Sequence, residues 1–144
     1  MEKRFYILAI IILSTVLPLF AQQNFVIILH KSVEGESLTR TNIESIFLGK
    51  KSRWSNGIKI VPVNLKSGEV YNTFIQTMIR KSPNAYTNYW RKMIFTGKGV
   101  MPLNCENEID MLNYVNKTPG AIGYISNNTE TGKHENVVVA QTPE

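Results

Sequence analysis

Cysteine is nearly absent from this sequence. The 144 residues include a single cysteine, Cys105, so no disulfide can form within the chain. Glu106 follows directly, and a neighbouring carboxylate raises the pKa of a thiol and keeps it protonated. Stabilisation by internal disulfides is therefore excluded, and catalysis by a thiolate is not expected.

Histidine and the common catalytic motifs are also scarce. Only His30 and His134 occur, and neither has a carboxylate or cysteine at metal-ligand spacing. No Gly-x-Ser-x-Gly nucleophile elbow and no Walker phosphate loop is present. Glu106, Glu108 and Asp110 suggest a calcium site, but the helix dipole alone explains acids at the start of a helix. We therefore predict that the protein is not an enzyme and has no metal or cofactor.

The longest apolar run lies at the N-terminus. Residues 2–4 are charged, the stretch from Phe5 to Phe20 is uncharged and apolar, and the small residue Ala21 follows. This order is typical of a secretory signal peptide. The alternative is an uncleaved membrane anchor, because the run approaches the roughly 17 residues that the shortest spanning helices need. The sequence favours a signal peptide at residues 1–21.

Cleavage after Ala21 would leave residues 22–144, enough for a single domain with one hydrophobic core. Gln22 stands at the position where a lipoprotein would have cysteine, so we expect a soluble protein after cleavage. The expected location is the periplasm. Contact with the membrane is expected only through the signal segment.

Positive charge is concentrated in the first part of this domain. Residues 31–98 contain 12 Lys and Arg against 4 Glu, whereas residues 99–144 contain 2 Lys and 6 acids. A basic face raises the local concentration of anions. Since an exported protein does not meet nucleic acid, we exclude that partner and expect a small anion or an envelope protein instead.

Hydrophobic patterns predict strands that alternate with helices, which indicates an α/β layered domain. Apolar runs predict strands at 24–29, 58–63, 121–125 and 137–140. The glycines at 97 and 99 predict a loop at 97–104. Apolar residues on one face predict helices near 39–49, 69–79, 82–97 and 107–116. Thr39 or Thr41 and Ser82 are the expected N-caps of two of these helices.

The predicted helix at 82–97 carries an aromatic stripe. Its apolar positions are Ala85, Tyr86, Tyr89, Trp90, Met93 and Ile94. Such a stripe can line a ligand site, but packing against the core is the more common role. We therefore expect these residues in the core.

A Ser-Gly pair lies where the predicted strand 58–63 leads into the helix at 69–79. Ser67 supplies a hydroxyl, Gly68 lets a ligand approach the backbone, and Lys66 adds positive charge. The first N–H groups of a helix are unpaired and its dipole favours an anion, so an anion site is one interpretation. The other interpretation is that Ser67 simply caps the helix. The pair alone leaves both open and favours the cap.

Four stretches, taken in order, resemble one family. They are IESIFLGKKSRWSNGIKIVPVN (43–64), KSGEVYNTF (66–74), YWRKMIFTGKG (89–99) and KTPGAIGYI (117–125). The pattern is similar to small proteins related to the phosphate ABC-transporter substrate-binding protein, within the type 2 periplasmic binding protein superfamily. The resemblance implies a central mixed sheet flanked by helices, corresponding to one lobe or a reduced form of the receptors.

The resemblance also implies a site. In phosphate-binding relatives an Arg-x-Asp-Gly-Ser-Gly-Thr loop contacts the oxyanion, and Ser67 and Gly68 match its Ser-Gly. Glu69 replaces the Thr, Lys66 the preceding Gly, and Val63 the Arg. The implied function is binding of phosphate or another small anion through Ser67, Gly68, Lys66 and Glu69, with an ABC transporter as partner. The alternative is a non-catalytic envelope interaction module that keeps the fold but has lost the ligand.

Overall fold

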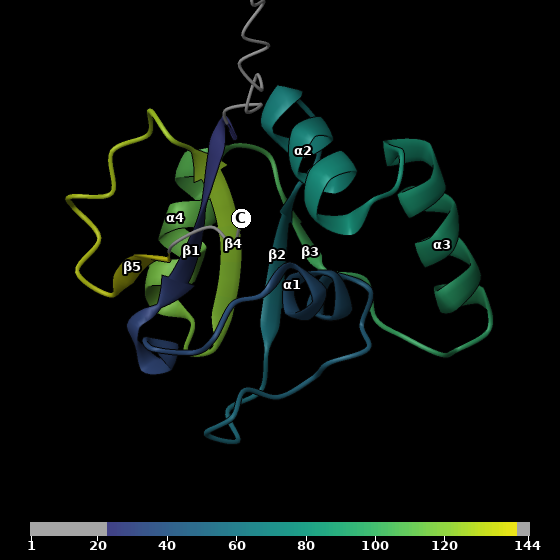
Figure 1. The fold of residues 1–144 in the computed structure, drawn as a ribbon, viewed down its shortest axis with the longest axis horizontal. Helices are drawn as coiled ribbons and strands as arrows, with labels where there is room; N and C mark the ends of the chain where they lie inside the picture. Colours follow the sequence, from purple (N-terminus) through teal and green to yellow (C-terminus); the bar gives the residue numbers. More distant parts are fainter. Residues whose placement is uncertain (1–22, 141–144) are drawn as a thin grey trace, which may run out of the picture.

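The computed structural model describes residues 23–140, and the predicted signal peptide at 1–21 lies outside this part. The described residues form a five-stranded sheet in the order β3-β2-β4-β1-β5 (Figure 1). The strands are β1 (Phe25–His30), β2 (Val61–Leu65), β3 (Leu103–Cys105), β4 (Ala121–Ser126) and β5 (Val137–Ala140). Strand β2 runs parallel to β3 and β4, whereas β1 is antiparallel to β4 and β5. The predicted mixed α/β fold is confirmed.

Helices connect the strands close to the positions predicted by hydrophobic periodicity. They are η1 (Lys31–Val33), α1 (Arg40–Phe47), α2 (Glu69–Phe74), the π-helix η2 (Ile75–Ile79), α3 (Pro83–Phe95) and α4 (Glu108–Lys117). The side chains of Thr39 and Ser82 accept the backbone N–H groups of Asn42 and Ala85, as expected for N-caps. Asn107 caps α4 in the same way.

Two predicted boundaries are wrong. The predicted strand 58–63 is shifted, because Lys59 pairs with Arg53 in an isolated bridge and the regular strand begins only at Val61. The predicted loop 97–104 ends inside β3, whose first two residues are exposed. Strand β3 is a short edge strand without apolar alternation, so the sequence pattern does not reveal it.

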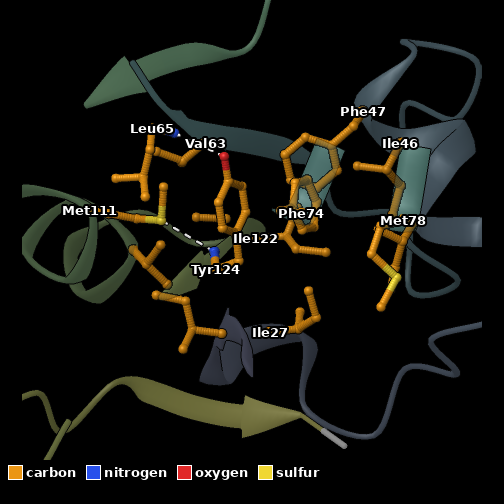
Figure 2. Close-up of a cluster of buried hydrophobic side chains, with 14 of the residues drawn as sticks. Ile27, Ile46, Phe47, Val63, Leu65, Phe74, Met78, Met111, Ile122 and Tyr124 are labelled. Atoms are coloured by element: carbon orange, nitrogen blue, oxygen red, sulfur yellow. Dashed lines mark hydrogen bonds between the residues drawn. The ribbon is translucent and has the colours of Figure 1, made fainter. Parts of the chain in front are cut away.

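Both faces of the sheet are covered by helices around β4. Gly123 faces α4, where an added Cβ would come within 2.7 Å of the sulfur of Met111. The next residue, Tyr124, points to the other face, as successive strand residues do. There its ring stacks on Phe74 of α2 with 3.7 Å between centroids, and Phe47 of α1 lies edge-on (Figure 2). These contacts fix α1, α2 and α4 around the central strands.

The aromatic stripe of α3 packs only in part. Tyr86 and Trp90 are fully buried and both donate to the carbonyl oxygen of Phe47, so the expected core role is confirmed for them. Ala85 is exposed and Ile94 is 53% exposed, so the prediction of these two as core residues is wrong. No helix in residues 23–140 combines the length and apolarity needed to cross a membrane.

Candidate functional site

The predicted site lies at one edge of the sheet, where two parallel strands end. Leu65 of β2 pairs with Cys105 of β3, and the N–H of Lys66 donates to the Cys105 carbonyl over 2.9 Å. Helices α2 and α4 both begin just after these strand ends, at Glu69 and Glu108. Ligands of open α/β sheets bind at the carboxyl ends of parallel strands, so this edge is the expected place for a site.

Gly68, not Ser67, is the N-cap of α2. Its φ of 111° and ψ of 173° lie in a region that only glycine adopts readily, and no side chain caps the helix. The interpretation of Ser67 as the cap is therefore wrong. Since no side chain accepts them, the N–H groups of Glu69 and Val70 at the start of α2 remain available as hydrogen-bond donors.

A shallow depression of about 260 Å³ lies over these two helix starts. Its lining is drawn from the ends of β2 and β3 and the first turns of α2 and α4: Leu65, Ser67, Gly68, Glu69, Val70, Glu106, Asn107 and Glu108. The structure thus brings Ser67, Gly68 and Glu69 to one depression, whereas Lys66 does not line it.

The sequence did not assign Glu106, Asn107 and Glu108 to this site. Their approach to Ser67 depends on the parallel pairing of β2 with β3, which joins segments about 40 positions apart. The available signal was the run of acids at the start of α4. The helix dipole alone explains that run, so the run does not indicate that these residues lie opposite Ser67.

The charged side chains around the depression oppose an anion. Lys66 Nζ and Glu106 Oε1 form an ion pair at 2.9 Å, which raises the pKa of Lys66 through the hydrogen bond and the charge of Glu106. Thr129 donates its hydroxyl proton to the carboxylate of Glu108. With Glu69 added, three carboxylates line the depression, and the Lys66 ammonium beside it is already engaged.

Beneath the site, β2 and β4 are joined by a buried polar contact. The hydroxyl of Tyr124 donates to Asn64 Oδ1 and accepts the N–H of Leu65 at 3.2 Å. Burial raises the pKa of Tyr124 well above its ordinary value, so the hydroxyl stays protonated and can donate. Val63, at the position where the resemblance places an Arg, is fully buried. The core side of β2 therefore supplies no cation to the site.

A larger hollow of about 550 Å³ lies between α4 and the chain before β5. Asn113, Asn116 and His134 line it, and Asn113 Oδ1 lies 3.1 Å from His134 Nε2. None of the predicted site residues lies there. Among the described residues, no three His, Cys, Asp or Glu side chains are grouped to hold a metal ion.

Comparison with known proteins supports the fold. No protein-family profile and no curated protein matches the chain. An ABC-type phosphate transport receptor from Vibrio cholerae matches 83% of this chain and 46% of its own, with 18% identity and a TM-score of 0.61. PstS from Borrelia burgdorferi matches 83% and 47%, with 15% identity and a TM-score of 0.60. The chain therefore has the fold of phosphate ABC-transporter receptors and spans a little under half of one receptor chain.

Proposed function

We propose that the protein is an exported, non-catalytic, solute-binding-like domain that takes phosphate or another small anion at residues 66–69. The observation that carries the proposal is the convergence of the α2 and α4 N-termini at the carboxyl ends of β2 and β3. Both helix dipoles favour negative charge at this edge. An ABC transporter or another envelope protein would be the partner.

The donors come mainly from the backbone. The N–H groups of Glu69 and Val70, in the first turn of α2, are two donors, and the exposed Ser67 adds a hydroxyl. Lys66 can contribute its charge only by leaving Glu106 or by bridging to the ligand. This set is small for a phosphate dianion, whose removal from water must be matched by several hydrogen bonds.

We therefore expect weak binding. The depression is shallow, Val63 replaces the Arg of phosphate-binding relatives, and Glu69, Glu106 and Glu108 repel a dianion. The same carboxylates favour a second candidate function, an envelope interaction module that no longer binds a solute. Such a module would contact its partner through the basic face of residues 31–98.

Isothermal titration of the protein with phosphate, sulfate and acetate at low ionic strength tests the proposal. We expect a dissociation constant on the order of millimolar for an anion held by few donors. Replacing Ser67 with Ala should weaken binding by about threefold or more, because it removes one hydrogen bond to the anion. The matched control is Ser52→Ala, an exposed serine outside the depression, which should leave binding unchanged.

The two candidates give different results. Heat from an anion that is reduced by Ser67→Ala supports the solute-binding function. No heat and no thermal stabilisation at millimolar anion would overturn it. Recovery of an envelope protein in a pull-down under those conditions would then favour the interaction module.

A further inference from the structure

The C-terminal end of α3 exposes large apolar side chains that the proposed function does not use. Phe95 is 93% exposed, Val100 is 89% exposed and Ile94 is 53% exposed. Figure 1 shows α3 at the outer margin of the fold, with its C-terminal end and the following loop far from β1 and β4. We call this region, Arg91–Val100, the α3 tip. Burying a phenylalanine is strongly favourable, so such exposure indicates a contact made with something else.

The charge around the α3 tip has one sign. Between Glu69 and Glu106 the sequence contains no acid but has five basic residues, and Arg91, Lys92 and Lys98 lie on the tip itself. All three are exposed. Among the described residues, the single ion pair of the protein is the distant Lys66–Glu106. Within residues 23–140, therefore, no carboxylate forms an ion pair with the cations of the tip.

The backbone holds the tip in a fixed shape. The N–H of Gly97 donates to the Ile94 carbonyl at 3.0 Å, and that of Lys98 donates to the Met93 carbonyl at 2.9 Å. With Gly97 at a φ of 66°, these two bonds form a Schellman motif. Binding through Phe95 would therefore lose little conformational entropy of the backbone, because the turn is already formed.

The loop after the turn packs back on the helix. A Cβ added to Gly99 would come within 3.1 Å of the Trp90 ring and 3.3 Å of the Met93 methyl carbon. Trp90 is itself buried against α1, where its Nε1–H donates to the Phe47 carbonyl. The tip is therefore anchored in the core through Trp90.

We propose that the α3 tip is a docking surface for an anionic phospholipid bilayer. Phe95, Ile94 and Val100 would enter the interface between headgroups and acyl chains, while Arg91, Lys92 and Lys98 would contact lipid phosphates. Exposed apolar side chains in the same short segment as exposed cations have both properties that interfacial binding needs, apolar area and attraction to anionic lipid. Charge complementarity selects a membrane with acidic headgroups. This adds a second membrane contact to the one expected from the signal segment.

Vesicle sedimentation tests this proposal. The form beginning at Gln22 is the one to use, because the apolar N-terminal run would bind vesicles by itself. This form keeps all the buried core residues of the described part, which run from Phe25 to Ile125. We expect the protein to sediment with vesicles that contain phosphatidylglycerol and to stay in solution with pure phosphatidylcholine. Salt should weaken the binding, because exposed charges are screened.

Variants locate the contact. Phe95→Ser should lower the partition coefficient at least about tenfold, and Lys98→Ser about fivefold. The matched control is Ile109→Ser, since Ile109 is a 55% exposed apolar residue on α4, outside the tip. Circular dichroism should be unchanged in all three, because the substituted side chains are exposed.

Two results would overturn the proposal. One is the absence of binding to phosphatidylglycerol vesicles at low ionic strength. The other is equal binding of the wild type and Phe95→Ser. If an acidic envelope protein is captured by the wild type and not by Phe95→Ser while vesicles are not bound, the α3 tip is a protein contact instead.

Discussion

Lys66 Nζ lies 2.9 Å from Glu106 Oε1, across the ends of the parallel strands β2 and β3. Both side chains are largely exposed, so the pair contributes little to stability. Its importance is for the ligand. The cation that adjoins the depression is held by a carboxylate of the opposite wall, so an anion must compete with that carboxylate.

Glu106→Gln should therefore strengthen phosphate binding. The substitution removes one of the three carboxylates around the depression and releases Lys66 from its ion pair. We expect the dissociation constant to fall by about three- to tenfold at low ionic strength, and less at high salt because the charges are exposed. Isothermal titration against the wild type measures the change.

The control for this prediction is Glu34→Gln. Glu34 is exposed and follows the end of β1, which runs antiparallel to β4 while β4 runs parallel to β2. Glu34 therefore lies beyond the opposite ends of the strands from the site. Glu34→Gln changes the net charge by the same amount as Glu106→Gln. Equal strengthening by both variants would attribute the effect to net charge, and no strengthening by Glu106→Gln would contradict an anion site at residues 66–69.

Tyr124→Phe should destabilise the fold while leaving the ring stack intact. The variant keeps the ring that stacks on Phe74 but removes the hydroxyl that binds both Asn64 Oδ1 and the Leu65 N–H. A buried polar group that loses its hydrogen-bond partner lowers the unfolding free energy by about 1–3 kcal/mol. Urea denaturation measures this loss. Tyr114→Phe, at a half-buried position on α4, is the matched control and should change stability by less than about 0.5 kcal/mol.

The sequence predicted the strand-to-helix turn at Ser67-Gly68 but not the residues that lie opposite it. A strand pattern followed by Ser67-Gly68 and a helix pattern fixes a strand-to-helix turn locally, and the structure has this turn. The carboxylates of Glu106 and Glu108 reach the same place only through a non-local parallel pairing. Hydrophobic periodicity gives the elements but not the order of strands in the sheet, so this wall could not be predicted.

The exposure of Ile94 at the end of α3 could not be predicted for a similar reason. Trp90 and Ile94 share a helix face, and periodicity treats them alike. Trp90 is covered by α1, but no described element covers Ile94 or Phe95 to the same extent. The pattern shows which face of a helix is apolar, whereas the length of helix that finds a partner depends on the tertiary arrangement.

Gly120→Ala should be strongly destabilising. Gly120 has a φ of 80°, and a Cβ there would come within 2.2 Å of the Lys59 carbonyl oxygen, which is backbone and cannot move aside. Its own carbonyl accepts the indole N–H of Trp54 at 2.9 Å. We expect a loss of at least about 2 kcal/mol in unfolding free energy, from strain and displacement together.

Gly132→Ala is the matched control for that loss. An added Cβ at Gly132 meets nothing within 4 Å, so its unfolding free energy should stay within about 0.5 kcal/mol of the wild type. Urea denaturation of both variants gives the comparison. Equal stability of Gly120→Ala and Gly132→Ala would contradict the close approach of the 118–120 turn to Lys59.

His30 should make stability depend on pH near neutrality. Burial and, to a smaller extent, Lys31 lower the pKa of His30, and its Nδ1 accepts the N–H of Ser32 at 3.1 Å. The native state therefore resists protonation, whereas the unfolded chain takes up a proton below about pH 6.5. The contribution of neutral His30 to the unfolding free energy is fully present above that pH. It is lost as the pH falls from there toward the lowered pKa of His30 in the folded state.

Replacing His30 with Asn keeps an acceptor near Ser32 and removes this titration. The unfolding free energy of the variant should fall less between pH 7.5 and about 5.5, a range in which ordinary carboxyl groups stay ionised. Urea denaturation at steps of pH measures both slopes. If the two slopes are equal, His30 does not resist protonation in the fold, and the hydrogen bond from Ser32 to Nδ1 does not hold it neutral.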